Sequence, residues 1–291
     1  MAVELVHLPE VERLSPSCIR ILGGNPSKFT LQGTNTYLVG TGSERLLVDT
    51  GEGKPSWISA LKRLLDQEKA TVQKVLLTHW HPDHTGGVSQ LLDTSHDAVI
   101  FKSSPGPSQQ NIAHGQVFEV EGATLKAVHT PGHTTDHMAF IFKEEDAIFT
   151  GDNVLGQGTA VFEDLSTYMT SLAKMENLVS GRGYPGHGPV LPAAQAKISE
   201  YISHRQQRET QVLETLGSLR EIPASTSVMS SSGKAGATPM ELVKIIYRDV
   251  PENLHLPAAR GVVQILHKLQ DEDKVLLEDG DRWSLRERPS L

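Results

Sequence analysis

Short apolar runs separated by glycine-containing corners fill the first two thirds of the chain. Runs rich in Val, Leu, Ile and Thr predict β-strands, which span Thr34–Gly40, Arg45–Gly51, Gln73–His81, Thr124–Thr130, Met138–Phe142 and Asp146–Asp152. Apolar residues at three- and four-residue spacing predict helices, which span Ser56–Ala70, Thr167–Met175 and Ala193–Arg208, and a further helix begins in Gly86–Leu92. Because strands in hairpin succession are interspersed with helices, the pattern predicts an α+β layered sandwich rather than a doubly wound sheet.

The C-terminal part of the chain has a different pattern. Pro223–Thr238 is rich in Ser, Ala and Gly, which is typical of a linker. Thr238 and Pro239 then predict the start of a helix, Leu256–Lys274 predicts a second one, and Asp279-Gly280 predicts the turn of a hairpin. Two helices and a hairpin indicate a small winged-helix-like domain. We therefore expect a main domain over residues 1–210, a linker over 211–238 and the winged-helix-like domain over 239–291.

Winged-helix domains often bind DNA, but the second predicted helix mixes its basic residues with acidic ones. It carries Arg260, His267, Lys268 and Lys274 beside Asp271, Glu272 and Asp273. This mixture does not make a recognition face for a polyanion, so we expect a structural or partner-positioning role for the domain.

Composition narrows the class of protein. Of 291 residues, 38% are hydrophobic and 21% are charged, as in ordinary globular proteins, and no run approaches the roughly 18 apolar residues of a membrane span. The net charge of -8 and the aromatic content of 5% disfavour nucleic-acid binding. The single Cys18 excludes an internal disulfide framework, and the N-terminus shows no secretory signal, so we expect a cytoplasmic protein that binds no membrane. The unusual number is 13 histidines, since histidine is the commonest metal ligand.

One short segment concentrates these ligand-type residues. His79, His81, Asp83 and His84 lie within six positions, directly after a predicted buried strand. Alternate residues of an extended segment share one side, so His79 and His81 point the same way, and Asp83 and His84 follow around a turn. A surface histidine cluster is the alternative, which the preceding buried strand disfavours. Neutral imidazoles and carboxylates without a thiolate suit Zn²⁺, Mn²⁺ or Fe²⁺.

Three further corners add ligand-type side chains. Thr-Pro-Gly-His places His133 past a strand end, Thr-Gly-Asp places Asp152 past another, and Tyr-Pro-Gly-His places His187 in a turn. Each of these signals is weak alone, because a histidine after Pro-Gly is usually a turn residue. Together with the first segment they complete two sets of metal ligands.

The segments HWHPDH, TPGHT, GD and YPGHG, in this order, resemble the metallo-β-lactamase superfamily over roughly Cys18–Tyr201. The resemblance implies an αββα sandwich with a site for two divalent ions at one edge, with Zn²⁺ as first choice and Mn²⁺ as second. Carried over by position, the first ion would be held by His79, His81 and His133, the second by Asp83, His84 and His187, and Asp152 would bridge them. Such sites hold ions roughly 3.5–4 Å apart and lower the pKa of a bound water toward about 7. The resemblance thus implies hydrolysis by metal-bound hydroxide, with Asp83 also acting as proton shuttle.

The flanking segments Lys28–Gly42, Gly151–Leu165 and Met240–Pro257 resemble a narrower branch of the superfamily. One kind of member is the fungal thioesterases that release aromatic polyketides such as atrochrysone carboxylic acid from the acyl carrier protein of a non-reducing polyketide synthase. The other is an animal endoribonuclease that cleaves single-stranded RNA. TGEGKPSW, LGQGTAVFEDL and SGRGYPGHG look closer to the thioesterases. The resemblance therefore implies a thioester hydrolase whose partner is an acyl carrier protein. An RNA endonuclease with the same ligands is the alternative, and a non-catalytic interaction module is a third reading.

Single residues near the motifs have two interpretations each. Asn35 and His204 are candidate substrate-binding residues, although Asn35 could also end a turn and His204 could be a helix-surface histidine. His137 could donate a hydrogen bond to a metal ligand, but a structural loop histidine is favoured. Asp164 is expected to cap the helix that follows it rather than to line a pocket.

Overall fold

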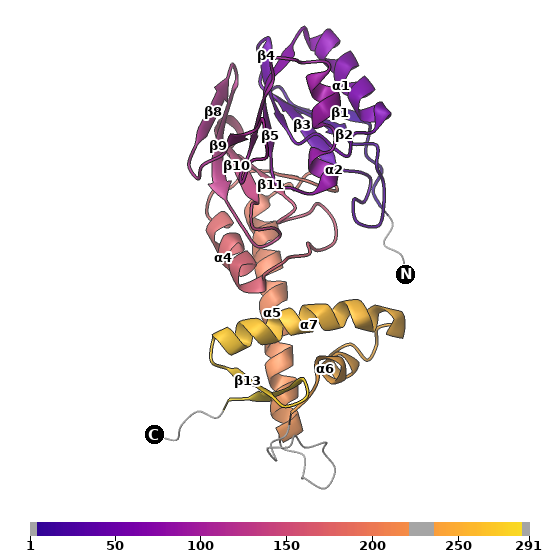
Figure 1. The fold of residues 1–291 in the computed structure, drawn as a ribbon, viewed down its shortest axis with the longest axis vertical. Coiled ribbons are helices and arrows are strands. Elements are labelled where there is room, and N and C mark those ends of the chain that lie inside the picture. Colours follow the sequence, from indigo (N-terminus) through magenta and orange to yellow (C-terminus); the bar gives the residue numbers. More distant parts are fainter. Residues whose placement is uncertain (1–4, 221–235, 287–291) are drawn as a thin grey trace. The chain divides into compact units, whose positions relative to one another are not determined.

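The first of two large sheets is mixed (Figure 1). A computed structural model describes residues 5–220 and 236–286. Seven strands lie in sequence order: β1 (Val11–Ser15), β2 (Cys18–Leu22), β3 (Asn35–Val39), β4 (Glu44–Val48), β5 (Thr71–Leu77), β6 (Val99–Lys102) and β7 (Gln110–Asn111). The pairs from β1 to β4 are antiparallel, and those from β4 to β7 are parallel. The parallel pairs require crossover connections, of which the first contains helix α1 (Pro55–Glu68).

The second sheet has five strands in the order β12-β11-β10-β9-β8. Their bounds are β8 (Val117–Val120), β9 (Ala123–His129), β10 (Met138–Phe142), β11 (Ala147–Gly151) and β12 (Gly183–Pro185). All neighbours are antiparallel except β11 and β12, which are parallel. The 3-10 turn η1 (Lys143–Glu145) joins β10 to β11.

The core has two apolar layers. Alternate residues of β3 divide between them, because successive side chains of a strand point to opposite faces. Tyr37 and Val39 pack with Phe140 and Phe149 of the second sheet in the inner layer, whereas Leu38 joins the outer layer beneath α1. On the other side, α4 (Leu165–Met175) and the start of α5 (Ala194–Arg220) follow β11 and β12 in the chain and bury apolar faces. The predicted sandwich of two sheets between helices is thus confirmed.

Loops after β5, β9, β11 and β12 contain the histidine and aspartate motifs. The loop after β5 leads into two short helices, α2 (Pro82–Thr85) and α3 (Val88–Leu92). The N-cap of α4 is Asp164, whose side chain accepts from the Thr167 amide, so the predicted capping role is confirmed. Within the described residues, no helix is long and apolar enough to cross a membrane.

The chain divides into two compact units, Met1–Tyr201 and Ile202–Leu291. Residues 211–220 of the predicted linker are helical, since α5 continues to Arg220 with Val212 and Leu216 buried four residues apart. Residues 221–235 of that linker lie outside the described part of the chain. The second unit also contains α6 (Pro239–Ile246), η2 (Glu252–Leu254), α7 (His255–Asp271) and the hairpin of β13 (Val275–Glu278) and β14 (Arg282–Leu285). This is the predicted order of two helices and a hairpin.

Candidate metal centre

The end of β5 sets the direction of the first two histidines. After Leu77 the chain bends at His79 and Trp80, and His81 is the N-cap of α2. Nε2 of His79 lies 2.9 Å from Nδ1 of His81, so these two side chains point to the same place, whereas Trp80 between them is 49% exposed. His79 is fully buried and His84, in α2, is too.

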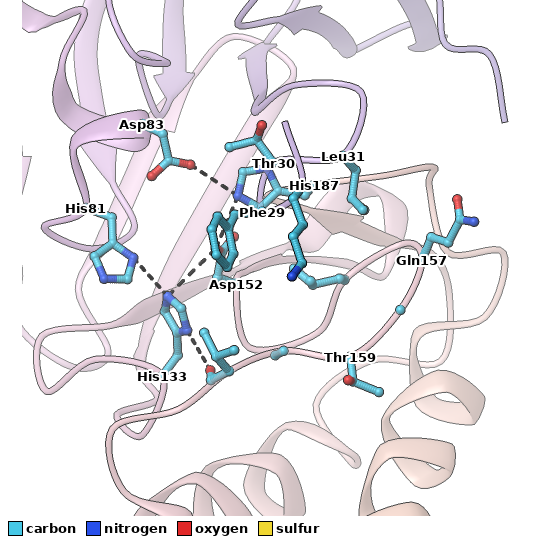
Figure 2. A pocket seen from close by; sticks show the side chains of 15 residues that line it. Phe29, Thr30, Leu31, His81, Asp83, His133, Asp152, Gln157, Thr159 and His187 are labelled. Atoms are coloured by element: carbon cyan, nitrogen blue, oxygen red, sulfur yellow. Dashed lines mark hydrogen bonds and ion pairs between the residues drawn. The ribbon is translucent and has the colours of Figure 1, made fainter. Parts of the chain in front are cut away.

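Four side chains form the first ligand group, His79, His81, His133 and Asp152, and their ligand atoms lie within 4.8 Å of one another. The Nε2 atom of His133 is 3.3 Å from Nε2 of His79 and 3.2 Å from Nδ1 of His81. Figure 2 shows His81, His133 and Asp152 converging on one wall of a pocket. The four residues come from three different loops, so only the folded chain brings them together.

Asp83, His84 and His187 form the second ligand group, also within 4.8 Å of one another. The Nε2 atom of His187 lies 3.2 Å from Oδ2 of Asp83 and 3.3 Å from Nε2 of His84. Asp152 spans both groups, because its Oδ2 is 3.2 Å from Nε2 of His187 and 3.7 Å from Nε2 of His133 (Figure 2). The structure therefore brings all seven predicted ligands together in the predicted grouping. Which ion each would hold stays a prediction.

Neighbouring acceptors orient two of the imidazoles. The Nδ1–H of His84 donates to Oδ2 of Asp49 at 2.8 Å, and that of His133 donates to the carbonyl of Val161 at 2.8 Å. An ionised carboxylate and a carbonyl only accept, so the hydrogen must lie on Nδ1 in both rings. In the neutral rings, Nε2 then presents a lone pair to the ligand group.

These donors fit divalent cations. Lone pairs of neutral imidazoles and the oxygens of Asp83 and Asp152 face one another at 3.2 to 3.7 Å, and without a cation or extra protons they would repel. Oδ1 of Asp152 is buried and makes no hydrogen bond within the described residues. The donor set of nitrogen and oxygen atoms suits Zn²⁺ or Mn²⁺. The His and Asp groups are thus positioned to bind metal ions.

The charges of the ion-free protein follow from burial and from the two carboxylates. Burial lowers the pKa of His79 well below its ordinary value. Burial also disfavours charge on His187, but the Asp152 carboxylate outweighs it and raises the pKa of His187 to about 9. Desolvation opposes ionisation of Asp83, yet hydrogen bonds from His187 and His84 hold its pKa well below its usual range. In the ion-free protein, protons on histidines such as His187 therefore offset the negative charge of the two carboxylates. A bound cation would displace these protons.

Two predicted substrate-binding residues are not placed in this pocket. Asn35 is buried, and its Nδ2 donates to the carbonyls of Pro185 and Gly188, both at 2.9 Å, so it ties β3 to the loop that carries His187. This is a positioning contact rather than a pocket wall, because Asn35 does not line the cavity. His204 lies on α5 in the second unit, and its contact with substrate stays a prediction.

Apolar side chains flank the ligand groups in the pocket, whose volume is about 360 Å³. Phe29 and Val161 line it and are 77% and 67% exposed, which is unusual for large apolar residues. Leu31 and Leu155 add further apolar surface, and among the described residues Lys28 is the sole Lys or Arg of the lining. The open side of the metal centre is therefore mainly hydrophobic.

Comparison with known proteins agrees with this geometry. The sequence profile of the metallo-beta-lactamase superfamily matches residues 29–187, and that of the beta-lactamase associated winged helix domain matches residues 238–283. The chain belongs to the metallo-beta-lactamase superfamily. Both the predicted family and the predicted winged-helix-like domain are thereby confirmed.

Superfamily members from fungi are similar over nearly the whole chain. "Lactamase-like protein ptaB" of Pestalotiopsis fici is 47% identical over 277 residues, which are 94% of this chain and 86% of that protein. "Lactamase-like protein aptB" of Emericella nidulans is 46% identical over 287 residues, which are 97% of this chain and 91% of that protein. These names specify no substrate.

Solved structures of the superfamily share the fold. A metallo-beta-lactamase family protein of Thermus thermophilus superposes with a TM-score of 0.69 at 21% identity, covering 94% of this chain and all of that one. A beta-lactamase domain protein of Burkholderia ambifaria superposes with a TM-score of 0.74 at 17% identity, covering 94% of this chain and 93% of that one. At such low identity the likeness is one of fold alone.

Three residues that contact members of the two ligand groups were not predicted from the sequence. Asp49 accepts from His84, Thr78 contacts Nδ1 of His79 at 2.9 Å, and Thr34 donates to Oδ2 of Asp83 at 3.1 Å. Asp49 directly follows the strand β4 and is followed by a glycine-containing corner. Asp152 was predicted from the same kind of position, an aspartate just past a strand end, so this pattern could also have indicated Asp49.

Proposed function

We propose that the chain is a metal-dependent thioester hydrolase that releases an aromatic polyketide from the acyl carrier protein of a non-reducing polyketide synthase. The observation that carries this proposal is the hydrophobic wall beside the ligand groups, formed by Phe29, Leu31 and Val161. An apolar acyl group gains by covering exposed apolar surface. The identity of the acyl group, of the atrochrysone carboxylic acid type, rests on the resemblance of the flanking segments to fungal thioesterases.

Hydrolysis of a thioester requires a nucleophilic water, a stabilised oxyanion and a proton for the departing sulfur. When bound, two divalent ions supply a water of lowered pKa and polarise the carbonyl. Zn²⁺ is our first choice and Mn²⁺ the second. A bond forms between the carbonyl carbon and the water oxygen, and the bond from carbon to sulfur breaks.

Asp83 would transfer the proton in this reaction. Its side chain lines the pocket, is 23% exposed and is held by the Thr34 hydroxyl and by His187. As a carboxylate within reach of the pocket, Asp83 would accept a proton from the attacking water. It then returns that proton to the thiolate that leaves.

Single-stranded RNA is the less favoured substrate. The same ligand groups suit attack on phosphorus, but RNA binding relies on phosphate contacts and on stacking. The net charge is -8, and in the part of the chain that the structure describes Lys28 alone offers a Lys or Arg charge in the pocket lining. A cytoplasmic location and a carrier-protein partner remain predictions from the sequence.

The test is thiol release from an aryl thioester of an acyl carrier protein, run beside cleavage of single-stranded RNA. Asp83→Ala is the test variant, and Asp97→Ala, at an exposed turn, is its matched control. We expect thioester turnover that falls by about 10²- to 10⁴-fold in Asp83→Ala and persists in the control. RNA cleavage that disappears in Asp83→Ala, with the thioester left intact, would show that the chain is a nuclease instead.

A further inference from the structure

One further histidine, His137, lies beside the two ligand groups and belongs to neither of them. His137 directly precedes β10, and it is fully buried. Its ring centroid is 5.4 Å from that of His79 and 5.9 Å from that of His133. Although it lies among the ligands, His137 is not one of the residues whose donor atoms converge.

Both nitrogens of His137 are used by hydrogen bonds within the protein. The backbone N–H of Asp152 donates to Nε2 at 3.1 Å, and Nδ1 lies 2.9 Å from Oγ1 of Thr130. A backbone N–H can only donate, so Nε2 carries no hydrogen and the proton of the neutral ring lies on Nδ1. The ring therefore accepts from Asp152 and donates to Thr130, so it bonds to the backbone of a ligand residue and not to a ligand side chain.

The ring also fills the space beside the backbone of Asp152. Gly151 has a φ of +49°, and a Cβ at this position would lie 2.4 Å from Nε2 of His137 and 3.2 Å from Cβ of Thr78. Glycine thus allows the chain to approach the ring closely enough for the next amide to bond to it.

The backbone around His137 joins the loops that carry the first ligand group. The amide of Thr130, three residues before His133, donates to the carbonyl of His137 at 2.9 Å. The amide of Met138 donates to the carbonyl of Thr78, next to His79, at 2.7 Å. His137 thus lies where the segments of His79, His133 and Asp152 meet.

We propose that His137 is a positioning residue that sets the affinity of the centre for its ions, by holding the main chain of Asp152 through Nε2. Asp152 is the carboxylate that spans both ligand groups, so a shift of its backbone moves its oxygens relative to His133 and His187 together. A ligand that is held in place before the ion arrives binds it more tightly, because less ordering accompanies binding. This role is the same for a thioester or an RNA substrate.

The experiment measures Zn²⁺ affinity by competition with a chromophoric chelator, using the full chain. His137→Leu removes the acceptor, His137→Gln keeps an amide oxygen that can accept, and His96→Leu, at an exposed position, is the control. We expect His137→Leu to weaken Zn²⁺ binding by about 10- to 100-fold, His137→Gln to regain most of this loss, and the control to match the unmodified chain. Unchanged affinity in His137→Leu, or equal loss in both variants, overturns the proposal.

Thermal unfolding of the ion-free proteins separates positioning from a loss of folding. We expect His137→Gln to unfold near the temperature of the unmodified chain. Should His137→Leu fail to fold, Thr130→Val tests the same point, since it removes the acceptor of Nδ1 and leaves the ring in place. We expect Thr130→Val to fold and to bind Zn²⁺ several-fold more weakly, and unchanged binding by that variant overturns the proposal. None of these readouts depends on which substrate is hydrolysed.

Discussion

Asp49 holds His84 by accepting its Nδ1–H at 2.8 Å, from a position 35 residues earlier in the chain. The same carboxylate accepts from the amide of Thr78 at 2.8 Å and from the Thr78 hydroxyl. Asp49 is buried and has a φ of +59°, which is uncommon for a residue other than glycine. The Asp49 side chain thus orients His84 of the second ligand group. It also holds the segment that carries His79 of the first ligand group.

Replacing Asp49 by Asn should weaken metal binding more than it harms the fold. An amide can donate to Nδ1 of His84, which would move the ring hydrogen to Nε2 and point it at the ligand group. We expect Zn²⁺ affinity to fall by about 10- to 100-fold, as for other residues that orient metal ligands. Chelator competition measures this, with Asp97→Asn as the control. Equal affinity of the two variants would contradict this role of Asp49.

Removal of the ions should lower both activity and stability. Seven buried or half-buried ligands face one another in the folded chain, and an ion that binds only this state stabilises it. We expect dialysis against EDTA to abolish hydrolysis and to lower the melting temperature, and added Zn²⁺ or Mn²⁺ to restore both. Elemental analysis of the restored protein should give two ions per chain. Full activity of the ion-free protein would contradict a metal-dependent reaction.

The motifs made the single ligand-type residues recognisable as candidates, because each lies just past a strand end in the sequence. The corner that holds His133 follows β9, and the corner that holds Asp152 follows β11. The division of these residues into two ligand groups came from the resemblance to the metallo-β-lactamase superfamily, because the strand pattern alone does not show which loops meet. The sequence also indicated the capping of α6 by Thr238, since Pro239 follows at the first helical position.

Contacts between distant segments were not predictable in the same way. The amide of Asn35 holds the loop of His187, and no local pattern shows which partner lies across the sheet, while its contact with substrate stays a prediction. His137 could be recognised as an acceptor only when the amide of Asp152 was seen to face it. Residues 211–220 of α5 were predicted as part of the linker. Most of them are polar, and the sequence does not show that Val212 and Leu216 among them are buried.

The capping box of the second unit gives a test of stability apart from the metal centre. The Thr238 hydroxyl accepts from the amide of Glu241 at 3.3 Å, and the Glu241 carboxylate accepts from the amide of Thr238 at 2.9 Å. Thr238→Ala should reduce the free energy of unfolding of this unit by about 1 kcal/mol. Urea unfolding followed by circular dichroism measures it, with Thr215→Ala on α5 as control. Zn²⁺ binding should not change, since all seven residues of the two ligand groups lie in the first unit.

Phe29 should decide which acyl groups are hydrolysed well. It lines the pocket beside His81 and Asp83, yet 77% of it is exposed, so the fold gains little from its ring. A bound aromatic acyl group would cover that ring, whereas an acetyl group is too small to gain much from it. We therefore expect Phe29→Ala to raise KM for an aromatic thioester by about tenfold, equivalent to about 1.4 kcal/mol, and to leave KM for the acetyl thioester nearly unchanged. Steady-state kinetics with both thioesters on the same carrier protein measures the difference, and Phe29→Leu should lie between the two. The melting temperature should stay the same in both variants. An equal rise of KM for both thioesters would mean that Phe29 contacts the carrier arm rather than the acyl group.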